Sequence, residues 1–115
     1  MPRTSGFDHV HLHVDDVGRA LAFYQTVFGA EEAFRVGHEL VFVRLSGGEI
    51  FALDARPEIE RIPTHVGLNL ADGEDLDAAV EEVVGAGGSL LERGEHAPGV
   101  PYAYLADPHG NLIEL

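Results

Sequence analysis

The chain repeats a short pattern at an offset of 56 residues, which is the spacing between His9 and His65. Residues 9–16 read His-Val-x-Leu-x-apolar-x-Asp, and residues 65–72 show the same pattern. At the same offset, and without a gap, Gly29-Ala30 corresponds to Gly85-Ala86. Chance can supply one such match, but the whole set at one offset indicates two copies of a single structural unit.

The first copy is predicted to begin with a strand followed by a helix. Residues 7–14 are predicted to form a strand, because Val10, Leu12 and Val14 alternate with His9, His11 and His13, which is the two-residue period of a strand. Apolar residues then recur at helical spacing over 17–28. Asp16 is the predicted N-cap of this helix, and Gly29 stands where a C-cap glycine belongs.

The second copy repeats this plan. It predicts a strand over 65–70, Asp72 as N-cap, apolar helical spacing over 76–84, and Gly85 after the helix. Three short β-rich runs follow each helix: 32–36, 39–46 and 49–54 in the first copy, and 88–93, 100–106 and 111–115 in the second, with a loop from Gly94 to Gly99.

The predicted order is therefore βαβββ twice, which is an α+β fold. We expect one domain over residues 1–115, with a first module at about 7–56, a linker at 57–63 and a second module at about 64–115. Two such modules can form one curved mixed sheet that encloses a site, with His9 and His65 at related positions. This arrangement is a topological expectation.

Charge and residue usage narrow the classes of function. Twenty acidic residues against seven Arg give a formal charge of −13, which repels phosphate backbones and anionic lipids, so we expect neither nucleic acid nor membrane as partner. The chain has no Lys, which excludes Schiff-base chemistry, and no Cys, which excludes thiolate metal ligands. No apolar run approaches the ~20 residues of a membrane span, and the first residues lack a signal-peptide core. A cytoplasmic protein is expected.

The repeated histidine is the first candidate for chemistry. His9 and His65 correspond, whereas His11 and His13 correspond to Gly67 and Asn69. An imidazole retained in both copies indicates a metal ligand, because neutral imidazole commonly binds transition metals. Glu114, in an otherwise apolar C-terminal run, is the candidate carboxylate that would complete a two-His-one-carboxylate site. A chelating pair from one strand, His9 with His11 or His11 with His13, is the alternative, since such side chains lie about 6.6 Å apart.

These segments resemble a known superfamily. Phe7–Asp16, followed by Arg19–Tyr24 and Phe28-Gly29, is similar to the first module of the vicinal oxygen chelate superfamily, and Tyr104–Glu114 resembles its closing hairpin. The superfamily includes glyoxalases, epimerases, fosfomycin-resistance transferases, bleomycin-binding proteins and extradiol dioxygenases. The resemblance covers essentially the entire chain and implies metal ligands at His9, His65 and Glu114.

The resemblance also ranks the activities. A fourth ligand position falls near Ala52, which offers no donor atom, and this disfavours glyoxalase chemistry. Fosfomycin transferases need a cationic cradle for a phosphonate, whereas the second copy has only Arg93. Extradiol dioxygenases carry a Tyr ten residues before the glutamate ligand, as Tyr104 stands before Glu114, and a His further upstream, to which His96 corresponds.

The sequence therefore predicts an extradiol-type dioxygenase that uses Fe(II) or Mn(II) and O2 to cleave a small catechol, an aromatic substrate. Tyr104 would hydrogen-bond substrate or oxygen, His96 would move the proton, and His11 and His13 would orient the ligands or narrow the pocket. The alternatives are another metal-dependent enzyme of the superfamily, either a glyoxalase-like lyase or isomerase or a thiol transferase, and a non-enzymatic binding protein. A homodimer is expected from the resemblance.

Overall fold

The computed structural model describes all 115 residues, which form eight strands and two helices. In chain order these are β1 (Thr4–His13), α1 (Val17–Phe28), β2 (Glu31–Val36), β3 (Leu40–Arg44), β4 (Ile50–Asp54), β5 (His65–Leu70), α2 (Leu76–Gly85), β6 (Ser89–Ala97), β7 (Val100–Ala106) and β8 (Leu112–Glu114). The α+β class and the βαβββ order of both copies are confirmed. The chain forms two compact halves, Asp8–Thr64 and Met1–Phe7 with His65–Leu115.

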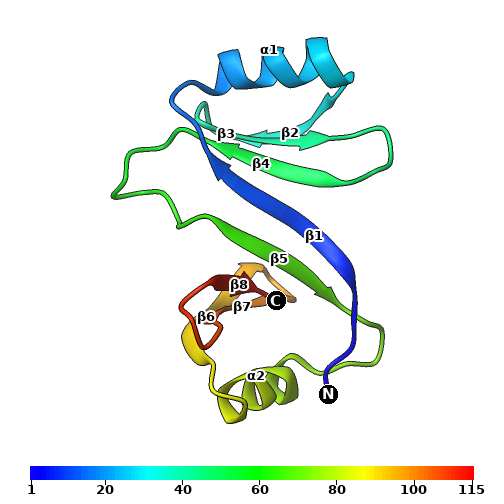
Figure 1. Cartoon of the computed structure of the whole chain (residues 1–115), viewed down its shortest axis with the longest axis vertical. Helices are drawn as coiled ribbons and strands as arrows, with labels where there is room; N and C mark the ends of the chain where they lie inside the picture. The colour runs from blue at the N-terminus through cyan, green and yellow to red at the C-terminus, as the bar shows by residue number, and fades with distance from the viewer. The chain divides into compact units, whose positions relative to one another are not determined.

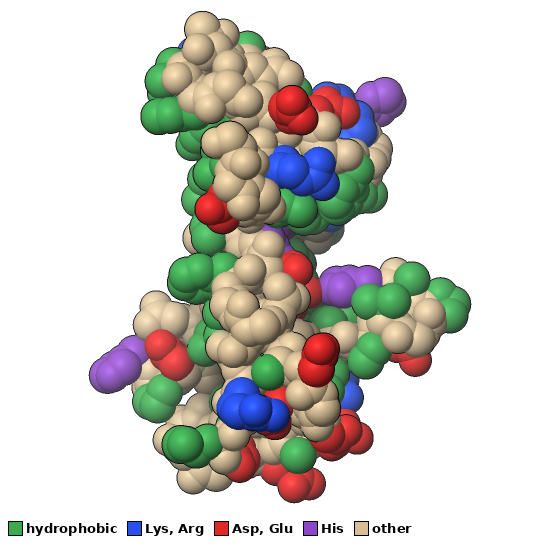
Figure 2. Space-filling view, turned by 90° about the vertical axis from the view of Figure 1, so that its right-hand side faces the viewer, with side chains coloured by type: hydrophobic (Ala, Val, Ile, Leu, Met, Phe, Trp, Pro, Cys, Tyr) green, Lys and Arg blue, Asp and Glu red, His purple; other side chains and the backbone are tan.

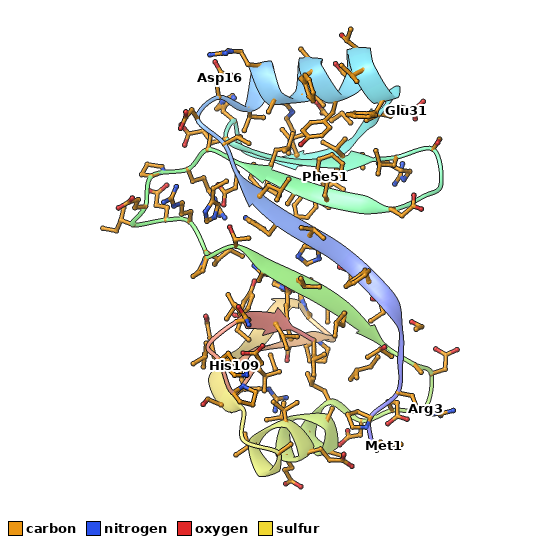
Figure 3. All side chains as sticks on the ribbon, in the orientation of Figure 1. Met1, Arg3, Asp16, Glu31, Phe51 and His109 are labelled. Atoms are coloured by element: carbon orange, nitrogen blue, oxygen red, sulfur yellow. The ribbon has the colours of Figure 1, made fainter.

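In the first half the strands follow the order β2-β3-β4-β1. β1 runs parallel to β4, and the other two pairs are antiparallel. α1 lies across one face of this sheet, and Phe51 points from β4 towards it (Figures 1 and 3). The buried core joins Val17 and Leu21 of α1 to Val41, Val43 and Leu53 of the sheet.

The ends of α1 are those predicted. The Asp16 carboxylate accepts a hydrogen bond from the Arg19 backbone N–H at 3.1 Å, which satisfies one of the unpaired donors of the first turn. Gly29 ends the helix in the left-handed conformation, with φ of 67°. Few residues other than glycine adopt this conformation without strain.

In the second half the strands follow the order β5-β8-β7-β6. β5 is parallel to β8, and the remaining pairs are antiparallel. α2 lies beside this sheet (Figure 1). The core here is small: Val80 of α2 packs with Ala103 and Leu105, with part-buried apolar neighbours around them. Neither α1 nor α2 is long and apolar enough to cross a membrane.

Two predictions about the ends of α2 are wrong. Asp75, not Asp72, caps the first turn, and its carboxylate accepts from the Ala78 backbone N–H at 3.0 Å. Asp72 precedes Gly73, whose φ of 84° belongs to a turn, so the helix starts three residues later than the repeat indicates. The helix also includes Gly85 as its last residue, and Ala86 is the C-cap.

The predicted loop from Gly94 to Gly99 is mostly strand. β6 continues to Ala97 and pairs with β7 in antiparallel register, including Gly94 with Tyr102 and Ala97 with Val100. Only Pro98-Gly99 forms the turn of this hairpin. His96 therefore lies on a strand and not in a loop, and this difference places it in the site described below.

Candidate functional site

In the first half, the three histidines of β1 lie on the sheet face opposite α1. Leu12 packs in the core beneath α1, so strand alternation directs His9, His11 and His13 to the other face. His9 and His11 are buried. With a proton on Nδ1, His9 donates to the Asp8 carboxylate at 2.6 Å. This tautomer keeps the lone pair on Nε2, which is the form in which imidazole binds a metal.

Asp54, at the end of β4, is the centre of a buried ionic network. Its carboxylate accepts from His11 Nε2 at 2.9 Å, from Arg56 Nε at 2.9 Å and from Arg56 Nη2 at 2.8 Å, and also from the Arg56 backbone N–H. Burial raises the pKa of Asp54, but the hydrogen bonds from Arg56 and His11 outweigh this effect and hold the pKa well below its usual range. Asp54 is therefore ionised at neutral pH.

This network surrounds the alternative metal site, in which His11 and His13 of one strand would bind the ion. One ligand atom from each of His11, His13 and Asp54 lies within 4.8 Å of the other two, so the face does carry a His/Asp cluster. A cation there would lie beside the Arg56 guanidinium, which already binds both Asp54 oxygens. Ala52, the register partner of His11, is fully buried and offers no ligand atom.

In the second half, His65 and Glu114 form a buried polar pair. His65 opens β5, and Glu114 ends β8 opposite Tyr104 of β7. Ala103 and Leu105, which flank Tyr104, pack towards α2, so Tyr104 and Glu114 face away from that helix. His65 Nε2 donates to Glu114 Oε2 at 3.0 Å, and both side chains are at least nine-tenths buried.

His96 and Tyr104 lie against the same carboxylate. His96 Nε2 donates to Glu114 Oε1 at 2.5 Å. The Tyr104 ring stands edge-on to His65, with the ring centres 5.3 Å apart. Burial and the nearby Glu114 charge raise the pKa of Tyr104, so its hydroxyl remains protonated at neutral pH. The structure thus brings together four residues that the sequence selected: His65, His96, Tyr104 and Glu114.

The metal triad of His9, His65 and Glu114 takes its residues from both halves, and it stays a prediction. The roles expected for His11 and His13 beside a metal stay predictions as well. In the first half these two imidazoles bind other groups, His11 the Asp54 carboxylate and His13 the Ile62 carbonyl oxygen.

Among residues 65–115, no Arg lies on the sheet face that carries Glu114. Arg93, the only Arg among residues 65–115, bonds to Asp77 of α2 at 2.6 Å, on the helix side. Glu92 of β6 pairs with Tyr104 and so lies on the Glu114 face. Acidic side chains are also spread over other parts of the surface, as Figure 2 shows. This face is suited to cations and neutral groups rather than to anions.

These features match a known family. The family model described as the glyoxalase/bleomycin resistance protein/dioxygenase superfamily matches residues 6–115. The chain belongs to this superfamily. Its tandem βαβββ modules are the fold of the superfamily, as the sequence resemblance implies.

Several individual proteins are similar to this chain. Metallothiol transferase FosB of Shouchella clausii is 28% identical over 119 residues, which cover 96% of this chain and 79% of FosB. Methylmalonyl-CoA epimerase of Mycobacterium tuberculosis has a TM-score of 0.74 at 18% identity, covering 100% of this chain and 89% of the epimerase. A Streptomyces coelicolor methylmalonyl-CoA epimerase has a TM-score of 0.68 at 21% identity, covering 97% and 96%.

None of these three relatives is a ring-cleaving dioxygenase. The comparisons therefore support the broad expectation of this superfamily and a site for a divalent metal, and among activities they favour the predicted alternatives over the catechol dioxygenase. At 18–21% identity the epimerases show the shared fold alone.

Sequence reasoning missed Asp8, Tyr102 and the role of Asp54. Asp8 directly precedes His9, and Tyr102 lies two residues before Tyr104, so it shares its strand face. Adjacency and strand alternation were therefore the available signals. The hydrogen bonds that these side chains make depend on register between strands, which the sequence does not state.

Proposed function

We propose that this chain is a metal-dependent enzyme that transfers a thiol to a small electrophile without negative charge. The buried His65–Glu114 pair carries the proposal. Two atoms bound to one ion at about 2.1 Å lie about 3.0–3.4 Å apart, and His65 Nε2 and Glu114 Oε2 are 3.0 Å apart. Imidazole and carboxylate suit divalent Mn, Fe and Zn. In the proposal His65 and Glu114 would hold the ion through these two atoms.

Thiol transfer is the reaction favoured by the similarity to the metallothiol transferase. The chain has no Cys, so the sulfur comes from a free low-molecular-weight thiol. An S–C bond forms while a C–O bond of the electrophile breaks, and the thiol proton ends on the released oxygen. The divalent cation would supply Lewis acidity that stabilises negative charge on this oxygen.

Tyr104 is proposed to donate a hydrogen bond to the same oxygen. Its hydroxyl belongs to the face that carries Glu114, and its raised pKa keeps the proton in place at neutral pH. A fixed donor of this kind typically contributes about 10²–10³ in rate, because the negative charge develops in the transition state. His96 is bonded to Glu114, so its role in the proposal is to orient the carboxylate.

The charge of this face supports an uncharged electrophile. Phosphonate recognition relies on Arg and Lys donors, and the only Arg among residues 65–115 is bound to Asp77. Glu92 and Glu114 on the same face would repel an anion. A neutral epoxide or a similar strained ether therefore fits this face better than a phosphonate.

A catechol dioxygenase that uses Fe(II) or Mn(II) and O2 is the second candidate. The observation that favours it is the position of Tyr104 and His96 against Glu114, since these residues were expected to serve that chemistry. The two candidates differ in what they consume: one consumes a thiol, and the other consumes O2.

The test follows from that difference. Protein loaded with Mn(II) or Fe(II) is incubated with glutathione or cysteine and a neutral epoxide, and free thiol and adduct mass are followed. We expect metal-dependent adduct formation, and a slower rate with an epoxide that carries a phosphonate. Oxygen uptake with catechols, matched to ring-opened product and without thiol adducts, would replace thiol transfer by the dioxygenase.

A further inference from the structure

The hairpin of β6 and β7 supports His96 from one side. The rings of Tyr102 and His96 are stacked, with centres 4.2 Å apart and planes inclined by 18°. The Tyr102 hydroxyl donates to Glu92 Oε1 at 3.1 Å. Tyr102 is thereby held at both ends, its ring by His96 and its hydroxyl by Glu92.

Gly94 makes room for this arrangement. It pairs with Tyr102 across the hairpin, and a Cβ atom built on it would lie 2.7 Å from the Tyr102 hydroxyl oxygen and 2.9 Å from the adjoining ring carbon. Real Cβ contacts are not this short, so any larger residue would displace the tyrosine. The φ angle of Gly94 is not positive, so the close approach of the Tyr102 ring, and not the backbone conformation, favours glycine here.

His96 needs such support because half of its side chain is exposed. An exposed side chain loses rotamer freedom when it is fixed, and this loss opposes a single hydrogen bond to Glu114. A ring stacked on the imidazole offsets part of this cost, since stacked aromatic pairs are favourable beyond the area they bury. The His96 bond at Oε1 in turn fixes the rotation of the carboxylate, so that Oε2 faces His65.

We propose that Tyr102 is a positioning residue for the metal ligand Glu114, acting through the stacked His96. The proposal rests on the metal site of the proposed function. Partners that orient metal ligands typically contribute about 10–100-fold in metal affinity. His96→Ala should weaken metal binding by about this factor, and Tyr102→Leu by about 3–30-fold, because it loosens His96 without removing it.

The experiment is titration calorimetry of the whole chain with Mn(II), with circular dichroism melts to show that each variant is folded. Tyr102→Phe keeps the stacked ring and should bind within about threefold of the wild type, whereas Tyr102→Leu should bind more weakly. Gly94→Ala should resemble Tyr102→Leu. Gly85→Ala is the matched control, because a Cβ there meets nothing within 4 Å.

A double variant tests whether Tyr102 affects Glu114 through His96. If Tyr102 acts through His96, the variant with both His96→Ala and Tyr102→Leu should bind no more weakly than His96→Ala alone. The proposal would be overturned if the losses of Mn(II) affinity in the two single variants added up in the double variant. It would also be overturned if a folded Tyr102→Leu protein bound Mn(II) with wild-type affinity. Neither result would contradict the metal site itself. If the wild type binds no Mn(II), the metal site fails, and the role of Tyr102 fails with it.

Discussion

The ionic network around Asp54 makes the most quantitative prediction, for the substitution Asp54→Asn. The side chain is fully buried and accepts four hydrogen bonds, three of them from Arg56. Asparagine has nearly the same shape but no charge, and its amide N–H group would face an N–H donor of Arg56 or His11. The substitution therefore removes the Asp54 charge from beside the Arg56 guanidinium.

The expected loss of unfolding free energy follows from the burial of the ion pair. Breaking a buried ion pair by removal of one partner costs about 3–5 kcal/mol. The Arg56 side chain is 26% exposed and can regain some hydration, so we expect the lower end, about 3 kcal/mol. Unfolding entropy of about 2.1 cal/mol/K per residue gives about 0.24 kcal/mol/K for this chain, so the melting temperature should fall by about 12 °C. Urea unfolding followed by circular dichroism measures the free energy directly.

The matched control is Glu58→Gln, which removes the negative charge from the exposed ion pair between Glu58 and Arg61. Glu58 is 88% exposed and lies 3.3 Å from Arg61, so the loss of unfolding free energy should stay below about 0.5 kcal/mol.

The stabilisation by Asp54 should also depend on pH in a defined direction. The folded-state pKa of Asp54 is lowered, so its stabilisation is complete above the unfolded value of about 3.9 and is lost as the pH falls towards the folded value. The gap between wild type and Asp54→Asn should be constant from about pH 5 to 8 and narrow below about pH 4. A variant as stable as the wild type, or a gap that widens in acid, would refute the reasoning.

Three further predictions concern packing, chemistry and assembly. Gly88→Ala should destabilise the chain by about 1–3 kcal/mol, because its Cβ would lie 2.7 Å from the Ala106 carbonyl oxygen, whereas Gly85→Ala should not; equal urea midpoints would contradict this. Tyr104→Phe should retain metal affinity and lower the rate of thiol adduct formation by about 10²-fold, since only the hydroxyl is lost; an unchanged rate excludes it as donor. Light scattering should give twice the chain mass if the expected homodimer forms, and a monomer mass would exclude the dimer.

The repeat predicted most of the fold because strand and helix periods are local properties. β5 and β7 begin and end at the predicted residues, and Asp16 and Gly29 cap α1 as expected. The prediction of the N-cap of α2 was wrong because it was inferred from the corresponding residue of the first copy. Asp72 aligns with Asp16, yet the turn at Gly73 delays the helix and Asp75 caps it instead.

The site was predictable in its residues but not in its contacts. A histidine kept at position 65 and a lone carboxylate at position 114 stand out in the sequence, and they form a hydrogen-bonded pair. The support from Tyr102 and Gly94 is not predictable from the sequence, because Gly94 reads there as the start of a loop. Glycine favours turns in general, and here it accommodates a ring from the neighbouring strand.

The central claim is that Glu114 helps to hold a divalent metal, and the affinity of the Glu114→Gln variant for Mn(II) tests it most directly. Gln keeps the shape of the side chain and removes the anionic ligand, while Glu81→Gln, at an exposed position of α2, removes one negative charge elsewhere. The account predicts one Mn(II) per wild-type chain, unchanged binding in Glu81→Gln, and an affinity lower by at least about 100-fold in Glu114→Gln. Full Mn(II) binding by the folded Glu114→Gln protein would contradict it.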